Sequence, residues 1–159
     1  MHHEVAILGA GFSGSIAALI AKQLGMNPVL IERGTHPRFA IGESSTPQAD
    51  IALEHIANKY NLPTLMPLAR YGTWKNTYPT IACGPKRGFT YIHHQDQEEL
   101  LVAANASQYE ADTHWYRADV DAFLVDEVKK CDIPYLDNNT FLLQYVNDKS
   151  ANAVHYRLA

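Results

Sequence analysis

Apolar and polar positions form three clear patterns along the 159-residue chain. Near the start, an apolar run at residues 5–8 leads into a glycine-rich turn, an Ala/Ile/Leu-rich stretch and a second apolar run at residues 29–31. Further along, residues 46–60 and 118–130 repeat apolar side chains every three or four positions, the period of a helix with one buried face. The pattern therefore predicts a strand–helix–strand unit over residues 4–32 and two later amphipathic helices.

Both later helices have recognisable ends and faces. Thr46 is suited to cap the N-terminus of the first of them, and Pro47 suits its first helical position. The buried face expected for this helix consists of Ala49, Ala52, Leu53, Ile56, Ala57 and Tyr60. The buried face expected for the second helix consists of Val120, Phe123, Leu124 and Val128.

The remaining segments are less regular. Residues 33–46 follow neither period and predict a long loop, and long ordered loops are usually functional. Residues 68–116 are insertion-like, with a helix-like stretch at 97–106. Strand-like runs at 133–136, 140–146 and 153–158 alternate with turn residues, which predicts hairpins. Because the sequence stops inside the last run, we expect the chain to be a fragment.

The glycine-rich turn carries the most specific chemistry. Gly9 permits a tight turn, Gly11 lets the backbone approach a pyrophosphate, and Gly14 lets the helix pack closely on the strand. The helix N-terminus then offers N–H groups and partial positive charge to the phosphates. Glu32 ends the second strand, where a carboxylate can accept hydrogen bonds from an adenosine ribose. The combination predicts a dinucleotide-binding unit; the alternative is a glycine turn that only packs.

The cofactor contacts expected from this unit are Gly9, Gly11, Phe12, Ser13, Gly14, Glu32 and Arg33. The turn by itself does not distinguish NAD from FAD. Arg33 is compatible with either cofactor and can also accept a 2′-phosphate.

Composition excludes several other classes. With a formal net charge of −4, the chain gives no electrostatic reason to expect nucleic acid or an anionic membrane as a partner. No apolar run is long enough to span a bilayer, and the apolar pattern begins too near the N-terminus for a cleavable signal peptide. Cys83, Cys131 and the paired histidines at 2–3 and 93–94 fit no metal-binding spacing. We therefore expect a cytoplasmic protein without a bound metal.

Two further motifs carry a family resemblance. Residues 42–47 read Gly-Glu-Ser-Ser-Thr-Pro, and residues 116–124 read Tyr-Arg-Ala-Asp-Val-Asp-Ala-Phe-Leu. Together with the glycine turn they resemble the FAD-dependent monooxygenase superfamily, and the loop at 42–47 is most similar to that of flavin-dependent halogenases of the tryptophan and phenol type. The resemblance implies a Rossmann-like α/β FAD-binding domain with a parallel sheet, helices and a β-hairpin over residues 1–159. Residues 68–116 would contribute to a substrate-facing region.

The resemblance also implies roles for particular residues. The flavin ring and ribityl chain are expected to contact Gly42, Glu43, Ser44 and Ser45. Arg117 matches the family arginine that reaches the ribityl–phosphate region, with a surface salt bridge as the alternative. Lys75, which follows Trp74, resembles the family lysine that delivers an electrophilic halogen, whereas the alternative is a solvated surface lysine. The serines can also simply cap the following helix.

The activity implied is halogenation of a small aromatic substrate, using halide, oxygen and reduced FAD from a separate flavin reductase. An aromatic hydroxylase or a prenyl reductase on the same scaffold is a second possibility, and a fragment that binds FAD poorly and catalyses nothing is a third. The family's Trp-x-Trp-x-Ile-Pro signature, its later Gly-Asp motif and the acidic residue opposite its lysine are absent from this sequence. We expect these to belong to a continuation of the chain.

Overall fold

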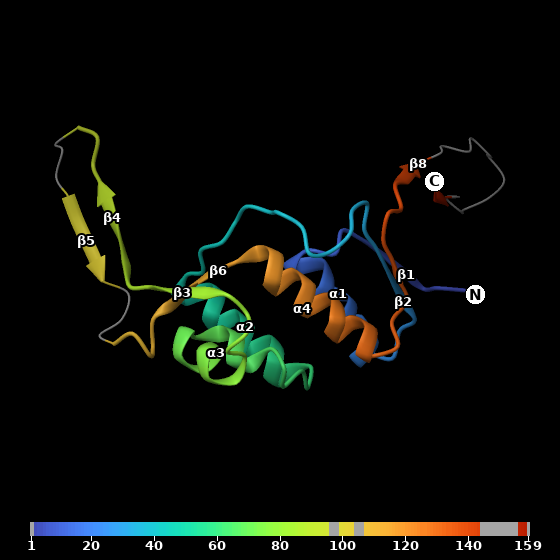
Figure 1. Ribbon diagram of the computed structural model, residues 1–159, viewed down its shortest axis with the longest axis horizontal. Helices are drawn as coiled ribbons and strands as arrows, with labels where there is room; N and C mark the ends of the chain where they lie inside the picture. Colours follow the sequence, from blue (N-terminus) through green and yellow to red (C-terminus); the bar gives the residue numbers. More distant parts are fainter. Residues whose placement is uncertain (1, 96–98, 104–106, 144–155, 159) are drawn as a thin grey trace. The chain divides into compact units, whose positions relative to one another are not determined.

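The computed structural model describes residues 2–95, 99–103, 107–143 and 156–158 (Figure 1). The chain divides into two compact units. The first unit comprises residues 1–38 and 121–159, and the second comprises residues 39–120.

A parallel sheet forms the centre of the first unit. Its strands are β1 (Val5–Leu8), β2 (Pro28–Ile31) and β7 (Tyr135–Leu136), in the order β1-β2-β7. Helix α1 (Phe12–Gln23) connects β1 to β2 and contacts both strands. The predicted strand–helix–strand unit and the Rossmann-like α/β fold class are therefore confirmed.

Burial explains why these segments fold as they do. Every residue of β2 is buried, as expected for a strand of a parallel sheet that is covered on both faces. Helix α1 buries Ile16, Ala18 and Leu19 along one side. Gly25 follows the helix with φ +79° and donates its N–H to the carbonyl of Lys22, which satisfies a carbonyl at the helix C-terminus.

Helix α4 (Arg117–Lys130) leads into β7. Val120, Leu124 and Val128 are buried as predicted, whereas Phe123 is only half-buried and Val125 is buried as well. The predicted pairing of residues 133–136 with 140–146 is wrong, because β7 instead pairs in parallel with β2. A strand can join a sheet at a place set far away in the sequence, and local turn residues do not reveal this.

The last described strands form a hairpin-like pair. β8 (Phe141–Leu143) runs antiparallel to β9 (Tyr156–Leu158). This agrees with the pairing predicted for the final two strand-like runs. The turn predicted at residues 147–150 lies outside the described residues.

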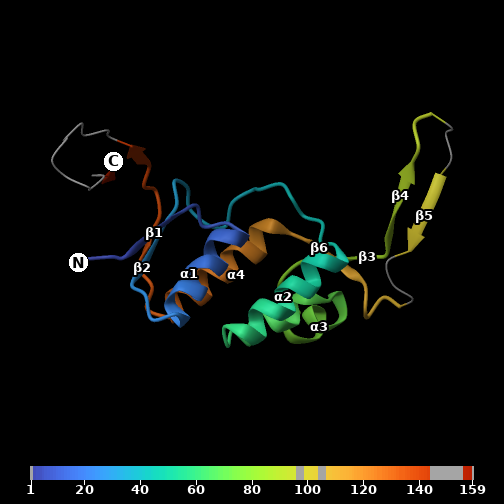
Figure 2. The same cartoon turned by 180° about the vertical axis from the view of Figure 1, so that it is seen from behind.

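The second unit begins with helices. Helix α2 (Pro47–Lys59) contacts the short 3₁₀ helix η1 (Met66–Ala69), which in turn contacts α3 (Tyr71–Thr77) (Figure 2). Of the face predicted for α2, Leu53 and Ala57 are buried and two residues are half-buried. Ala49 and Ala52 are exposed, however, and Asp50 is buried in their place. The predicted face was therefore partly wrong.

Two pairs of strands complete this unit. β3 (Cys83–Lys86) pairs antiparallel with β6 (Asp112–Trp115), and β4 (Gly88–Ile92) pairs antiparallel with β5 (Glu99–Ala103). The helix predicted over 97–106 is therefore wrong where the chain is described, because residues 99–103 form a strand. Residues 97–98 and 104–106 lie outside the described residues.

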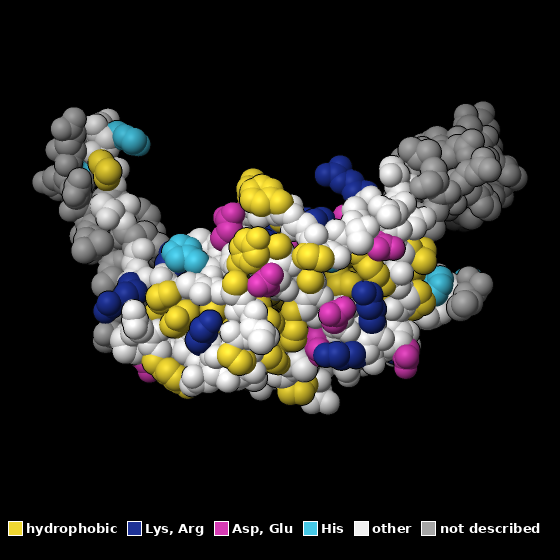
Figure 3. All heavy atoms as spheres, in the orientation of Figure 1, with side chains coloured by type: hydrophobic (Ala, Val, Ile, Leu, Met, Phe, Trp, Pro, Cys, Tyr) yellow, Lys and Arg dark blue, Asp and Glu magenta, His cyan; other side chains and the backbone are white. Residues whose placement is uncertain are grey.

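The surface mixes both signs of charge. On the face shown in Figure 3, Lys and Arg side chains are interspersed with Asp and Glu, in keeping with the small net charge of −4. Among the described residues, no helix is both long enough and apolar enough to cross a membrane.

Candidate functional site

The glycine-rich turn lies between β1 and α1 in the first unit. Gly9 has φ +96°, a conformation that L side chains rarely adopt. A Cβ atom on Gly14 would lie 1.8 Å from the carbonyl oxygen of Gly9, so only glycine allows this approach. The backbone therefore has the tight turn predicted at Gly9 and the close helix–strand approach predicted at Gly14.

The N-terminus of α1 has the chemistry of an anion site. Its N-cap residue is Gly11, which has no side chain to cap the helix, and its first turn contains no acidic residue. The carbonyl of Gly11, the N-cap residue, accepts the N–H of Ser15 at 3.0 Å, so the N–H groups of the first turn point toward this end of the helix. The positive end of the helix dipole is therefore not neutralised from within the helix. Phe12 is half-buried and Ser13 is exposed at this end.

Glu32 lies at the end of β2 and ties the turn to the sheet. Its carboxylate accepts hydrogen bonds from Ala10 N at 2.8 Å and Gly34 N at 3.0 Å, and Arg38 lies 3.3 Å away. Burial of the side chain, which is 4% exposed, opposes ionisation. The two backbone hydrogen bonds and the Arg38 charge outweigh it and hold the pKa of Glu32 below its usual value. The residue is thus a fixed carboxylate beside the glycine turn.

His36 and Tyr135 both interact electrostatically with this carboxylate. The rings of His36 and Tyr135 are tilted with their centroids 6.5 Å apart, and both ring nitrogens of His36 and the Tyr135 hydroxyl lack a hydrogen-bond partner within the described part of the chain. Burial and the Arg38 charge lower the pKa of His36, while burial together with Asp137 and Glu32 raises that of Tyr135 to about 12.

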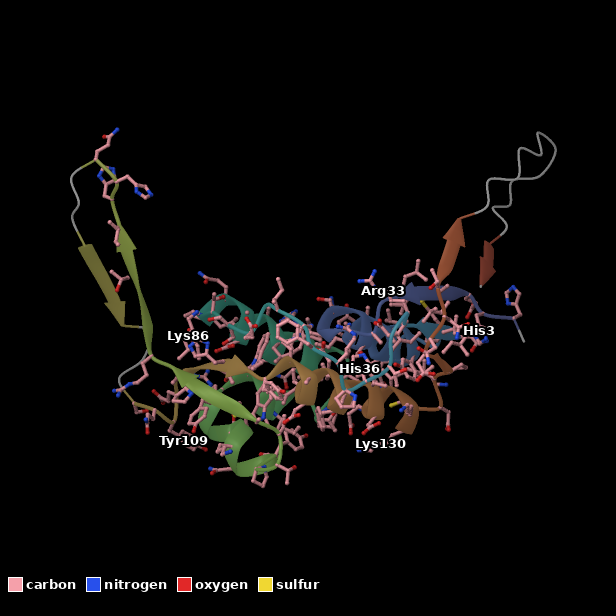
Figure 4. All side chains as sticks on the ribbon, turned by 45° about the horizontal axis from the view of Figure 1, so that its top comes forward. His3, Arg33, His36, Lys86, Tyr109 and Lys130 are labelled. Atoms are coloured by element: carbon pink, nitrogen blue, oxygen red, sulfur yellow. The ribbon has the colours of Figure 1, made fainter. Side chains whose placement is uncertain are left out.

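Arg33 differs from these residues in its exposure. Its side chain is exposed, whereas His36 is half-buried (Figure 4). Tyr135 comes from β7, about a hundred residues further along the chain, so no local signal could associate it with Glu32.

In the second unit, the loop at residues 42–47 is held like an extra strand against β6. Ser45 N donates to Thr113 O at 2.9 Å, and Thr113 N donates to the Ser45 hydroxyl at 2.8 Å. Trp115 N donates to Glu43 O at 2.6 Å, and Ser44 forms an antiparallel bridge to β6. Residues 43–45 therefore have a defined backbone path although the sequence predicted an irregular loop.

Arg117 fixes the start of this loop. Its guanidinium donates to the carbonyl of Ile41 at 2.7 Å and lies 3.4 Å from that of Gly42. At the other end of the loop, the Thr46 hydroxyl accepts the N–H of Ala49 at 3.3 Å, which confirms the predicted helix cap. The loop is thus anchored at both ends.

Two lysines differ in their relation to this loop. Lys75, on α3, is exposed, and its ammonium lies 3.5 Å from the carbonyl of Pro79. Lys86, on β3, is half-buried and donates to the carbonyl of Ser45 (Figure 4). Lys86 is the last residue of β3. The pairing that brings β3 to the loop through β6 is long-range and leaves no trace in local sequence.

The described ranges contain no candidate metal site. There, no group of three or more His, Cys, Asp and Glu side chains is arranged to hold a metal ion.

No protein-family model matches this chain. Two relatives do match in sequence. The chain is 32% identical over 162 residues to the monodechloroaminopyrrolnitrin halogenase PrnC of Pseudomonas fluorescens, an alignment that covers 96% of the chain and 28% of the relative. It is 28% identical over 135 residues to the tetracycline 7-halogenase of Kitasatospora aureofaciens, which covers 77% of the chain and 23% of the relative. The chain therefore spans less than a third of the length of either protein.

Solved structures show the same fold. The halogenase PltM, in its complex with phloroglucinol and FAD, superposes with a TM-score of 0.82 at 23% identity and covers 99% of this chain and 31% of its own. The myxobacterial chondrochloren halogenase CndH superposes with a TM-score of 0.65 at 21% identity and covers 98% of this chain and 33% of its own. By sequence and by fold, the chain belongs to the flavin-dependent halogenase family and has the Rossmann-like α/β fold of that family's FAD-binding domain.

Proposed function

We propose that this chain is the FAD-binding part of a flavin-dependent halogenase that acts on a small aromatic substrate. The observation that supports FAD most directly is the close approach at the N-terminus of α1, where a Cβ on Gly14 would lie 1.8 Å from the carbonyl oxygen of Gly9 and the first helical turn carries no acidic residue. A phosphate at that position would face N–H groups and positive helix charge. The relatives PrnC and PltM are named as halogenases, and PltM is described with FAD.

Different residues of the chain would bind different parts of the cofactor. The turn at Gly9–Gly11–Gly14 with Phe12 and Ser13 would hold the pyrophosphate, and Glu32 and Arg33 the adenosine. Gly42, Glu43, Ser44, Ser45 and Arg117 would hold the ribityl chain and the flavin. Bound FAD would supply the oxygen activation and halide oxidation that the protein's own side chains lack. The role of the chain is to bind the cofactor, orient it and exclude water.

Two lysines are candidates for the halogen-delivering residue. Lys75 is our assignment from the family resemblance. Lys86 is a second candidate, because its ammonium contacts Ser45 in the proposed flavin loop. Lys75→Ala and Lys86→Ala form a matched pair: the variant that loses halogenation while retaining FAD identifies the lysine, and loss in neither variant excludes both.

FAD binding by the chain itself is the first test. We expect the purified chain to take up FAD, observed as flavin absorbance that remains with the protein through gel filtration. Gly14→Ala should abolish this, whereas Gly84→Ala, where a Cβ would lie 3.9 Å from its nearest neighbour, should not. A chain that elutes without flavin at saturating FAD would end the cofactor proposal.

Halide dependence distinguishes the alternatives. The protein is incubated with FAD, a separate flavin reductase, oxygen and an electron-rich phenol, in the presence of bromide, of chloride or of no halide. A separate reductase is the arrangement expected in the cytoplasm. Mass spectrometry of a halogenase reaction shows halogenated phenol only when halide is present. A hydroxylated product that forms without halide would favour the aromatic hydroxylase instead, and a reduced prenyl substrate would favour the reductase.

A further inference from the structure

Two buried carboxyl groups meet behind the loop at residues 42–47. Asp50, in the first turn of α2, is 7% exposed, and Asp112, the first residue of β6, is 2% exposed. The carboxyl group of Asp50 interacts with that of Asp112 and with the hydroxyl of Ser45. One carboxylate oxygen on each aspartate lacks any partner among the described residues.

Two negative charges cannot both be accommodated here at low cost. Buried carboxylates in contact repel each other strongly, and one of them usually retains a proton. Arg70, the cation whose charge acts on Asp50, already pairs with Glu54 at 3.0 Å, so its charge is largely compensated. Lys86 donates to the backbone carbonyl of Ser45. The dipole of α2 favours a charged Asp50, but burial and Asp112 act against it.

We propose that Asp50 and Asp112 hold one proton between them and that this proton locks Ser45, and with it the loop at residues 42–47, to β6. Ser45 is the shared contact. Its hydroxyl accepts from Thr113 N at 2.8 Å and interacts with the carboxyl group of Asp50, so α2, the loop and β6 all meet at one side chain. When the proton is lost, repulsion between the carboxylates acts to separate the first turn of α2 from β6, and Ser45 lies between the two elements.

The electrostatics give the pH at which the lock should open. Burial and the neighbouring Asp112 raise the pKa of Asp50 from its usual value near 4 to about 7. The lock therefore holds below neutral pH and weakens above it. This device is independent of FAD and can be tested on the chain alone.

The first measurement is a carbon-13 NMR titration of the chain labelled at its aspartate carboxyl carbons. One carboxyl signal should titrate with a midpoint near 7 and disappear from the spectrum of Asp50→Asn. If every aspartate signal titrates below pH 5, the two carboxyl groups do not share a proton and the proposal is overturned. Asp50→Asn serves only to assign the signal, and the titration itself uses the unaltered chain, so the midpoint does not depend on the variant folding.

The second measurement follows the loop. The chain's two tryptophans, Trp74 and Trp115, stack with centroids 6.5 Å apart, and Trp115 is bonded to Glu43 in the loop. Their emission should change between pH 6 and 8 in the unaltered chain. In Asp50→Asn, whose amide can donate to Asp112 at any pH, this change should be lost.

Glu110→Gln is the matched control. Glu110 is an exposed carboxylate two residues before Asp112, and its replacement should leave the emission profile unchanged. His114, exposed and next to Trp115, is present in all these proteins and so cancels in the comparison. If Asp50→Asn retains the full emission change, the proton does not act on the loop, and that part of the proposal fails.

Discussion

Gly14 is the residue at which the smallest chemical change should have the clearest effect. In Gly14→Ala, the new methyl group would lie 1.8 Å from the carbonyl oxygen of Gly9 and 3.1 Å from its carbon, both of them backbone atoms. The turn must therefore move, and we expect a loss of about 1–3 kcal/mol in the free energy of unfolding. Urea denaturation measures it, with Gly84→Ala as the control. Equal midpoints for the two variants would contradict the close approach.

Glu32 should make the stability of the first unit depend on pH. Because the pKa of its carboxyl is lowered in the folded chain, the residue stabilises the fold above its unfolded pKa, and this stabilisation is lost as the pH falls through the folded value. Glu32→Gln should cost about 1–3 kcal/mol at pH 7, because it removes a carboxylate that accepts buried N–H groups.

The expected comparison is between urea midpoints at pH 7 and at pH 3 to 4. The difference in urea midpoint between Glu32→Gln and the unaltered chain should become smaller as the pH falls. Asp126→Asn, which removes an exposed carboxylate on α4, should behave like the unaltered chain within about 0.5 kcal/mol at both pH values. A gap that widens on acidification would show that the Glu32 pKa is raised instead.

The role of a single residue could be predicted from the sequence when its partners are close to it along the chain. Gly9, Gly14 and Glu32 were predicted because a tight turn, a close helix approach and the end of a strand are local requirements. Tyr135 and Lys86 were missed because each reaches its partners only through strand pairing: β7 with β2, and β3 with β6. The contact partners of Lys75 and Arg117 were likewise beyond what the sequence alone could supply.

At the scale of elements, the start of α2 depends on one cap. Thr46→Ala removes the hydroxyl that accepts Ala49 N, and we expect a loss of about 1 kcal/mol, while Thr46→Ser should retain most of the stability. Urea midpoints of the two variants against the unaltered chain measure this. Equal losses in both would mean that the methyl group of Thr46, not its hydroxyl, carries the effect.

The helices were easier to predict than the strands. α1, α2 and α4 have a repeating apolar face and recognisable ends within a single segment of sequence. The run around Leu100–Val102 has neither a repeating apolar face nor recognisable ends in its own sequence. It forms a strand because it pairs with β4. The burial of Asp50 in place of Ala49 and Ala52 is also a tertiary effect. Its carboxyl group interacts with Ser45 and Asp112, and the apolar period of the helix does not reveal these polar neighbours.

At the scale of the whole molecule, the two units should respond differently to parts of the cofactor. We assign the pyrophosphate and adenosine of FAD to residues of the first unit, and the ribityl chain and flavin to residues 42–45 and Arg117 of the second. ADP contains only the first set of groups. It follows that ADP and FAD should compete, and that substitutions in the two units should separate their affinities.

Calorimetric titrations of ADP and FAD into three variants make this prediction specific. Gly14→Ala should lose both ligands, because its turn can no longer close. Arg117→Gln should bind ADP normally and FAD about tenfold more weakly, since one charge-assisted hydrogen bond is worth about 1.5–3 kcal/mol and part of it is recovered by water. Arg87→Gln, a change at an exposed arginine in the same unit, should leave both affinities unchanged. If Arg117→Gln weakens ADP as much as FAD, Arg117 does not act on the flavin half, and its carbonyl contacts at Ile41 and Gly42 are its whole role.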